Sequence, residues 1–191
     1  MPFNKISDWL KQEKDAGSTN PDRAVLATTA SDNVPHSRVV AIREITTDGV
    51  LFFTQRGTKK VAELTGNPHA SMTFWLAMQQ REIILDGAVN ALSVEENQLY
   101  WLTMPHDRQV RFSTYAPTSN QPINSTAELA QKYSALLQEF DNKLVPMSKF
   151  YCGFRLTPNT ICFYTLGSES FSEVIRYIRN NNTWDEQLLS P

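Results

Sequence analysis

Strand-forming runs joined by short turns are the feature that most constrains the fold of this chain. The first five runs are rich in β-branched and apolar residues and occupy residues 24–30, 36–46, 49–55, 69–77 and 81–92. Asp48-Gly49, between the second and third runs, is a strong hairpin signal. Parallel strands need a crossover of about a dozen residues or more, so these short connections imply antiparallel pairing.

Helical patterns precede, interrupt and follow these strands. Residues 7–17 form an amphipathic pattern in which we expect Ser7 to be the N-cap and Gly17 to end the helix. Ser93 is followed three residues later by Glu96, which is the spacing of a capping box. The expected helices cover residues 7–17, 59–66, 93–104, 106–116 and 125–142, and residues 117–124 have the composition of a loop.

The last third of the chain returns to strand-forming sequence. The expected strands are residues 150–158, 160–166, 172–179 and 183–189, with a hairpin turn before the last of them. If six to eight of these strands pair antiparallel, with the helices at the periphery, the chain is an α+β protein, mainly antiparallel, with a β-barrel. The length of 191 residues fits one domain, residues 1–191.

Charge and cysteine content exclude several classes of function. The net charge of −2 argues against general affinity for nucleic acid. Cys152 and Cys162 do not form a C-x-x-C pair, and the three histidines lie far apart, so we expect neither a metal site nor a disulfide framework. The N-terminus has no apolar signal core, and no run approaches the roughly 18 apolar residues of a membrane span. These features predict a soluble, cytoplasmic protein.

A dense group of cationic and hydroxyl side chains follows the third strand. It consists of Thr54, Arg56, Thr58, Lys59 and Lys60, at the start of an expected helix. Helix N-termini favour anions, and lysine there is unfavourable for the helix dipole unless an anion is bound. Arg38 lies on the strand that would pair with residues 49–55, which brings it to the same end of the sheet. The stretch is either a phosphate site or a solvated basic helix start.

Segments on both sides of this group resemble the pyridoxamine 5′-phosphate oxidase family. The similarity is carried by SRVVAIRE, GVLFFTQRGTKKVAELTGNPHASMTFW and REIILDGAV, and by CGFRLTPNTICFYTLGSES and IRYIRNNNTWDEQLLSP near the end. It covers nearly the whole chain. The resemblance implies a split β-barrel, a homodimer, and FMN bound at the subunit interface.

The resemblance also implies which residues bind FMN. Arg38, Val39, Val40, Ala41 and Arg43 would lie along the cofactor, and Phe53, Thr54, Lys59 and Lys60 would hold its phosphate and ribityl chain. Further contacts would come from Glu82, Ser119 or Asn120, and Tyr164. Two of these depart from the family pattern, because Lys59 replaces the usual arginine and Glu82 replaces a glutamine. A glutamate cannot donate to the flavin ring unless it is protonated.

The site for the substrate phosphate departs further from the family pattern. Arg43, Tyr100 and Arg108 remain as candidate substrate residues. Positions where the family has cationic or histidine side chains hold Met104, Ser170, Ser172 and Val174. Losing several charged contacts should abolish useful phosphate affinity. The sequence therefore predicts an FMN-dependent oxidoreductase acting on an unidentified small molecule.

Two alternatives remain open. The chain is a genuine pyridoxamine or pyridoxine 5′-phosphate oxidase, or it is a non-catalytic split-barrel module that binds flavin or haem. Because flavin performs the electron chemistry, the chain needs no nucleophile of its own, and no catalytic side chain is assigned.

Overall fold

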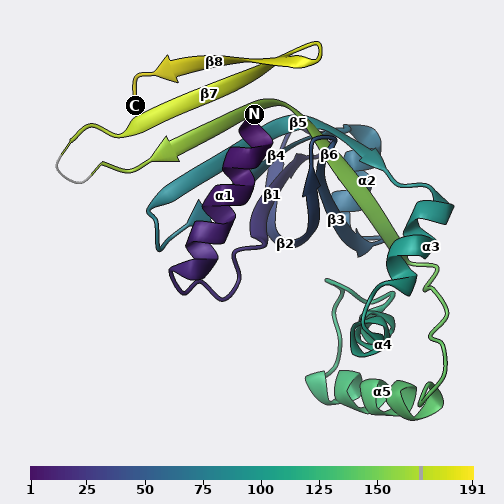
Figure 1. Ribbon diagram of the computed structural model, residues 1–191. Coiled ribbons are helices and arrows are strands. Elements are labelled where there is room, and N and C mark those ends of the chain that lie inside the picture. Colours follow the sequence, from purple (N-terminus) through teal and green to yellow (C-terminus); the bar gives the residue numbers. More distant parts are fainter. Residues whose placement is uncertain (168–169) are drawn as a thin grey trace. The chain divides into compact units, whose positions relative to one another are not determined.

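A computed structural model describes residues 1–167 and 170–191, in which strands dominate (Figure 1). The strands are β1 (Arg23–Thr29), β2 (Pro35–Thr46), β3 (Gly49–Gln55), β4 (His69–Leu76), β5 (Arg81–Ala91), β6 (Tyr151–Thr165), β7 (Glu173–Asn180) and β8 (Thr183–Leu189). The helices are α1 (Pro2–Asp15), α2 (Lys59–Gly66), α3 (Val94–Leu102), α4 (His106–Tyr115) and α5 (Thr126–Glu139). No helix in the described ranges is long and apolar enough to cross a membrane.

The strands form one sheet that closes on itself. Their order is β3-β2-β1-β4-β5-β6-β7-β8, and an additional pairing of β3 with β6 closes the first six into a barrel. Neighbouring strands joined by short turns pair antiparallel, as in β1–β2, β2–β3 and β4–β5. The hairpin predicted at Asp48-Gly49 forms, with Thr46 paired to Gly49. The predicted α+β fold with a mainly antiparallel barrel is confirmed.

The prediction of two separate strands in residues 150–166 is wrong, because β6 runs unbroken through Pro158. A proline cannot donate a ladder hydrogen bond, which is why the sequence pattern suggests a break there. Pro158 lies just before the point at which β6 begins to pair with β7, at Thr160. The strand therefore tolerates a proline where its pairing changes.

The predicted N-cap at Ser7 is also wrong. Helix α1 begins at Pro2, and Ser7 lies inside it, with its hydroxyl donating to the carbonyl of Phe3 at 3.1 Å. Proline is favoured in the first helical turn because its missing N–H has no intrahelical partner there. Gly17 follows the helix end with φ of 103°, a left-handed conformation that suits glycine, as predicted.

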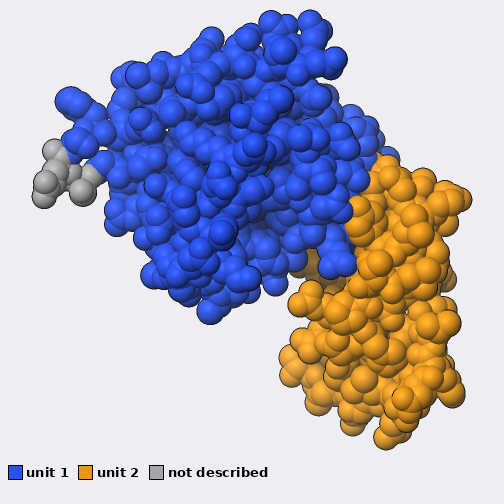
Figure 2. All heavy atoms as spheres, viewed as in Figure 1, with its two compact units in different colours: residues 1–53, 63–90, 154–191 blue, residues 54–62, 91–153 orange. Residues whose placement is uncertain are grey.

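The chain divides into two compact units, coloured separately in Figure 2. Unit 1 comprises residues 1–53, 63–90 and 154–191, and unit 2 comprises residues 54–62 and 91–153. Unit 1 contains most of the barrel, α1 and the β7–β8 hairpin, whereas unit 2 contains α3, α4 and α5. That residues 1–191 form one domain stays a prediction.

The core of unit 1 consists of side chains that point inward from alternate strand positions. Leu26, Met72, Phe74 and Leu85 are completely buried. Helix α1 covers part of this unit, with the ring of Trp9 5.0 Å from that of Phe163. The carboxylate of Glu13, 2% exposed, accepts hydrogen bonds at 3.1 Å from the backbone amides of Met78 and Gln79, in the β4–β5 turn.

Unit 2 is organised around three aromatic rings. The ring centroids of Trp101, Phe112 and Tyr151 lie 5.0–5.7 Å apart, with edge-to-face geometry. The indole of Trp101 donates to a backbone carbonyl at 2.9 Å. The capping box predicted at Ser93 and Glu96 is present, which starts α3 and directs Trp101 into this core. These helices carry Tyr100 and Arg108, two of the predicted substrate residues.

Candidate functional site

Cationic and hydroxyl groups gather in unit 2 where β3 ends and α2 begins. The ammonium of Lys60 lies 3.0 Å from Thr54 Oγ1 and 3.5 Å from Thr58 Oγ1. Thr58 precedes the helix, as predicted, and its carbonyl accepts from the amide of Val61. Its hydroxyl donates to the carbonyl of Gln55 at 2.8 Å instead of capping the helix. The structure therefore brings Thr54, Thr58 and Lys60 together.

A buried glutamine links this cluster to the predicted loop. Gln55 is 2% exposed, and its Oε1 accepts from the amide of Ser119 at 2.9 Å. Its Nε2 has no hydrogen-bond partner among the described residues. Ser119 thus meets the cluster through Gln55, which sequence reasoning did not single out. Asn120 is exposed, with φ of 61°.

Cys152 lies beside the same cluster. Its Sγ is 3.6 Å from the carbonyl oxygen of Thr54, to which it donates. Burial raises the pKa of the Cys152 thiol to about 11, and the positive charges of Arg56 and Lys60 oppose that shift. The thiol is therefore neutral at physiological pH, which agrees with its reading as a small strand hydrophobe and not a nucleophile.

A second polar cluster, in unit 1, surrounds Arg38. Its Nη2 lies 3.1 Å from Glu63 Oε2, and its Nη1 donates to the hydroxyl of Thr28 and, at 3.3 Å, to the carbonyl of Leu26. The hydroxyl of Thr28 also donates to Glu63 Oε2, and His36 Nδ1 lies 2.8 Å from Glu63 Oε1. Leu26 pairs with Arg38 and Thr28 with His36 across β1 and β2, so all four lie on one face.

Glu63 is the centre of this cluster. The residue is 6% exposed. Burial raises the pKa of its carboxyl, but the hydrogen bonds from Thr28 and Arg38 and the charges of Arg38 and His36 outweigh burial, so the net pKa is lowered. Sequence reasoning missed Glu63 and Thr28, and it gave His36 no role here. Sequence reasoning identified Arg38 but not what holds it.

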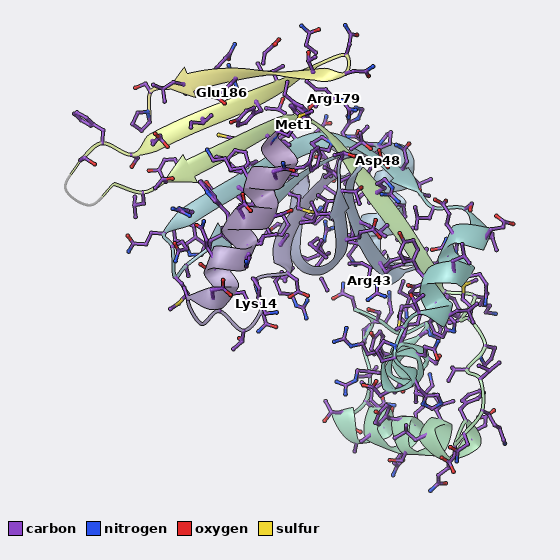
Figure 3. All side chains as sticks on the ribbon, in the orientation of Figure 1. Met1, Lys14, Arg43, Asp48, Arg179 and Glu186 are labelled. Carbon is purple, nitrogen blue, oxygen red and sulfur yellow. The ribbon has the colours of Figure 1, made fainter. Side chains whose placement is uncertain are left out.

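The other residues predicted on β2 divide between its two faces. Val40 is buried on the face that carries Arg38, while Val39 and Ala41 are exposed on the opposite face. Arg43 is also exposed and projects from β2 (Figure 3). The strand alternates in this way because successive side chains point to opposite sides. That all five line a cofactor stays a prediction, as does the role of Lys59, exposed in the first turn of α2, and of Phe53, half-buried at the end of β3.

The aromatic position predicted near the flavin has a local partner. The hydroxyl of Tyr164 donates to Ser172 Oγ at 2.9 Å, and the amide of Gly167 donates to the same oxygen at 3.2 Å. Val174 is buried opposite Tyr164 in the β6–β7 pair. Ser172, one of the departures from the family pattern, is therefore already engaged with Tyr164 and Gly167.

The remaining predicted residues lie on β5, on α3 and α4, and in the connection between these two helices. Glu82 is half-buried on β5, opposite Trp75 of β4. Tyr100 is half-buried on α3, and Arg108 is exposed in the first turn of α4. Met104, in the connection between these helices, is half-buried. The roles of all four stay predictions.

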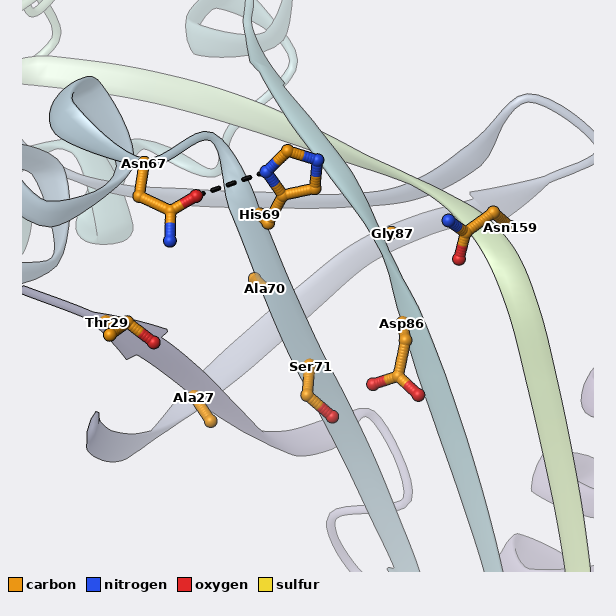
Figure 4. A pocket seen from close by; sticks show the side chains of 9 residues that line it. All are labelled: Ala27, Thr29, Asn67, His69, Ala70, Ser71, Asp86, Gly87 and Asn159. Carbon is orange, nitrogen blue, oxygen red and sulfur yellow. Dashed lines mark hydrogen bonds between the residues drawn. The ribbon is translucent and has the colours of Figure 1, made fainter. Parts of the chain in front are cut away.

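A hollow of about 300 Å³ lies on unit 1 and was not predicted (Figure 4). The ring of His69 contacts Asn67 Oδ1 at 3.1 Å at one side of it. Its lining comes chiefly from β1, β4 and β5 and consists of Ala27, Thr29, Asn67, His69, Ala70, Ser71, Asp86, Gly87 and Asn159. None of these is a predicted site residue.

Comparisons with known proteins find one family model that matches most of the chain and relatives that match its whole length. Residues 10–136 match the family model described as pyridoxamine 5′-phosphate oxidase. A protein of Alteromonas mediterranea named pyridoxine/pyridoxamine 5′-phosphate oxidase is 34% identical over 191 residues, covering 100% of this chain and 89% of the relative. A protein of the same name from Serratia proteamaculans is 29% identical over 190 residues, covering 100% of this chain and 87% of the relative.

Two solved structures share the fold. PhzG from Burkholderia lata 383, in complex with tetrahydrophenazine-1-carboxylic acid, superposes with a TM-score of 0.89 at 26% identity, covering 100% of this chain and 92% of that one. A pyridoxamine 5′-phosphate oxidase-related, FMN binding protein from Nostoc punctiforme has a TM-score of 0.78 at 15% identity, covering 98% and 96%. The barrel is therefore the split barrel predicted from the sequence.

Proposed function

The chain belongs to the pyridoxamine 5′-phosphate oxidase family, and from this we propose that it is an FMN-dependent oxidoreductase that oxidises pyridoxine or pyridoxamine 5′-phosphate. The observation that carries the cofactor assignment is the cluster of Lys60, Thr54 and Thr58 in unit 2. The substrate assignment is supported by the names of the full-length relatives.

The residues present fit the phosphate end of FMN. A phosphate needs several donors that converge, and Lys60 with the hydroxyl of Thr54 offers them at the start of α2. The buried Nε2 of Gln55 is a further donor, with no partner among the described residues. We expect Lys59, Lys60 and Thr54 to hold the phosphate, and we expect Arg38 to contact the cofactor because the family resemblance implies it. FMN, when bound, supplies the two-electron acceptor chemistry.

The chain's own contribution to the substrate is positioning. Arg43, Tyr100 and Arg108 are the side chains that we expect to bind the substrate phosphate. Arginine suits this role because its planar donors match phosphate oxygens in pairs. Tyr100 supplies a hydroxyl donor and an aromatic face. No side chain of this set needs to exchange a proton for binding.

A second candidate substrate is favoured by the side chains that replace the family's cations. Met104, Ser170 and Ser172 offer no positive charge, and Ser172 already accepts from Tyr164 and Gly167. A substrate without phosphate, such as a reduced fused-ring carboxylic acid, suits that composition. The similarity to the Burkholderia lata protein, with its tetrahydrophenazine carboxylic acid, supports this candidate.

A spectrum followed by turnover distinguishes these functions. We expect the purified protein to show the absorption of flavin, whereas a haem band or no chromophore would contradict the cofactor assignment. Oxygen consumption is then measured with pyridoxine 5′-phosphate, pyridoxamine 5′-phosphate and a reduced phenazine carboxylic acid. Turnover of either B6 phosphate supports the first candidate. Turnover of the phenazine acid alone supports the second.

We also propose that the protein is a homodimer, as the resemblance implies. On the outer face of unit 1, Val39, Val25, Thr73 and Ile84 form a row of cross-strand partners. Val39 is 64% exposed, Val25 40%, and Trp75, two positions along β4, 55%. Contiguous exposed apolar side chains of this kind are typical of an interface.

The mass of the protein in solution tests this proposal. We expect twice the mass of one chain for the wild type and the mass of a monomer for Trp75→Glu. A wild-type monomer would contradict the proposal.

A further inference from the structure

The carboxylate of Glu63 is shared by more groups than a simple ion pair requires. Its Oε2 accepts from Thr28 and from Arg38 Nη2, and its Oε1 faces His36 Nδ1 at 2.8 Å. Thr28 in turn accepts from Arg38 Nη1, so the hydroxyl, guanidinium and carboxylate form a closed triangle. Such an arrangement restricts the guanidinium to one orientation, because each of its two terminal nitrogens has a fixed acceptor.

The geometry leaves one edge of Arg38 for another acceptor. The guanidinium is planar and carries five N–H donors in a fixed fork. The described contacts involve Nη1 and Nη2 and lie toward Leu26, Thr28 and Glu63. The edge formed by Nε and the second hydrogen of Nη2 can donate to two phosphate oxygens at once. Its direction is set by the contacts on the opposite side.

We propose that Glu63 is a positioning residue of the flavin site, which fixes the Arg38 guanidinium so that its free edge meets the cofactor phosphate. The proposal rests on the assignment of FMN made above. Glu63 itself does not touch the phosphate, since two negative groups in contact would repel. The hydroxyl of Thr28 holds the carboxylate in place from β1, and His36 Nδ1 on β2 faces it at 2.8 Å.

Two possible roles of Glu63, neutralising the charge of Arg38 or fixing its position, predict opposite changes in FMN affinity when Glu63 is removed. If Glu63 only neutralised Arg38, its removal would expose an uncompensated cation and strengthen phosphate binding. If it positions Arg38, its removal frees the guanidinium to rotate, and the phosphate must then restrict it at an entropic cost. The sign of the change in FMN affinity therefore decides between the two.

The experiment is a double-mutant cycle on FMN affinity, measured by quenching of FMN fluorescence. We expect Glu63→Gln to weaken binding roughly tenfold in the wild-type background and not to weaken it in the Arg38→Ala background. Equal weakening in both backgrounds, or tighter binding in the wild-type background, would overturn the proposal. Glu13→Gln is the matched control, because Glu13 is an equally buried carboxylate of unit 1 with no contact to Arg38.

Two further measurements keep the proposal testable if a variant misfolds or FMN does not bind. Thr28→Val removes one corner of the triangle, with its contacts to Arg38 and Glu63, and keeps the side-chain shape. We expect it to weaken FMN binding about threefold; an unchanged affinity would count against the proposal. If wild-type protein binds no FMN, the cofactor assignment fails, but the positioning of Arg38 by Glu63 is still tested by the next measurement. Inorganic phosphate should still shift the nuclear magnetic resonance signal of the Arg38 Nε–H in wild type and less in Thr28→Val. Absence of that shift in wild type would overturn the proposal.

Discussion

Removing the charge of Lys60 is the most direct test of the phosphate cluster. The ammonium lies 3.0 Å from Thr54 Oγ1 and 3.5 Å from Thr58 Oγ1, and the side chain is half-buried. Lys60→Met keeps a flexible chain of similar length and removes only the charged end. Packing is therefore preserved, so a change in affinity reports the lost cation.

The size of the effect follows from the contact that is lost. A hydrogen bond between a charged donor and a charged acceptor contributes about 1.5–3 kcal/mol net. This corresponds to a dissociation constant for FMN that is about 10- to 150-fold larger. In high salt, the increase in the dissociation constant should lie toward the lower end of this range, because the ammonium is not fully buried and added ions screen it.

The assay is titration of the protein with FMN, followed by fluorescence and repeated at two salt concentrations. Lys143→Met is the control, because Lys143 is an exposed lysine of unit 2 whose Nζ donates to a carbonyl of α5. We expect the control to bind like wild type, and Lys60→Ala combined with Arg38→Ala to bind more weakly than either single variant. An unchanged affinity in Lys60→Met would show that this cluster is not a phosphate site but the solvated helix start that the sequence also allows.

Three further predictions concern stability. Gly87→Ala should lower the free energy of unfolding by about 1–3 kcal/mol in urea, because a Cβ would lie 2.2 Å from the carbonyl oxygen of Thr157, whereas Gly66→Ala, with open space around it, should not. Glu13→Ala should cost about 1–3 kcal/mol by the same measure, since it leaves two turn amides without their acceptor. The thiol pKa of Cys152 is raised from 9.0 to about 11, so stability should fall as pH rises from 9 through 11, and Cys152→Ala should lose that part of the pH dependence.

Much of the fold was predictable because its signals are local. The hairpin at Asp48-Gly49 and the capping box at Ser93 each depend on a few adjacent residues, and both form as predicted. The errors arise where a longer-range feature overrides a local one. Pro158 is accommodated because β6 changes partners next to it, and the position of that change depends on β7, which is distant in sequence.

The cluster in unit 2 was predictable for the same reason. Thr54, Thr58 and Lys60 lie within seven positions of one another, so a strand end and a helix start suffice to bring them together. Ser119 reaches this cluster through Gln55, a contact across 64 positions that no local pattern specifies. Ser119 was predicted from the family resemblance and not from its separation in sequence from the cluster.

Glu63 shows why the partner of a predicted cation is harder to find than the cation. Its acidic side chain stands in α2 next to Leu64, in a short helix whose other charged residues are exposed or half-buried, and nothing in that pattern marks it as buried. The informative signal is on β2, where His36 and Arg38 occupy alternate positions and so share a face with each other and with buried Val40. Two basic side chains, half-buried on the face of a strand that carries a buried valine, favour a nearby anion, because burying an unpaired charge is strongly disfavoured. Glu63, the buried acidic residue of α2, supplies that anion.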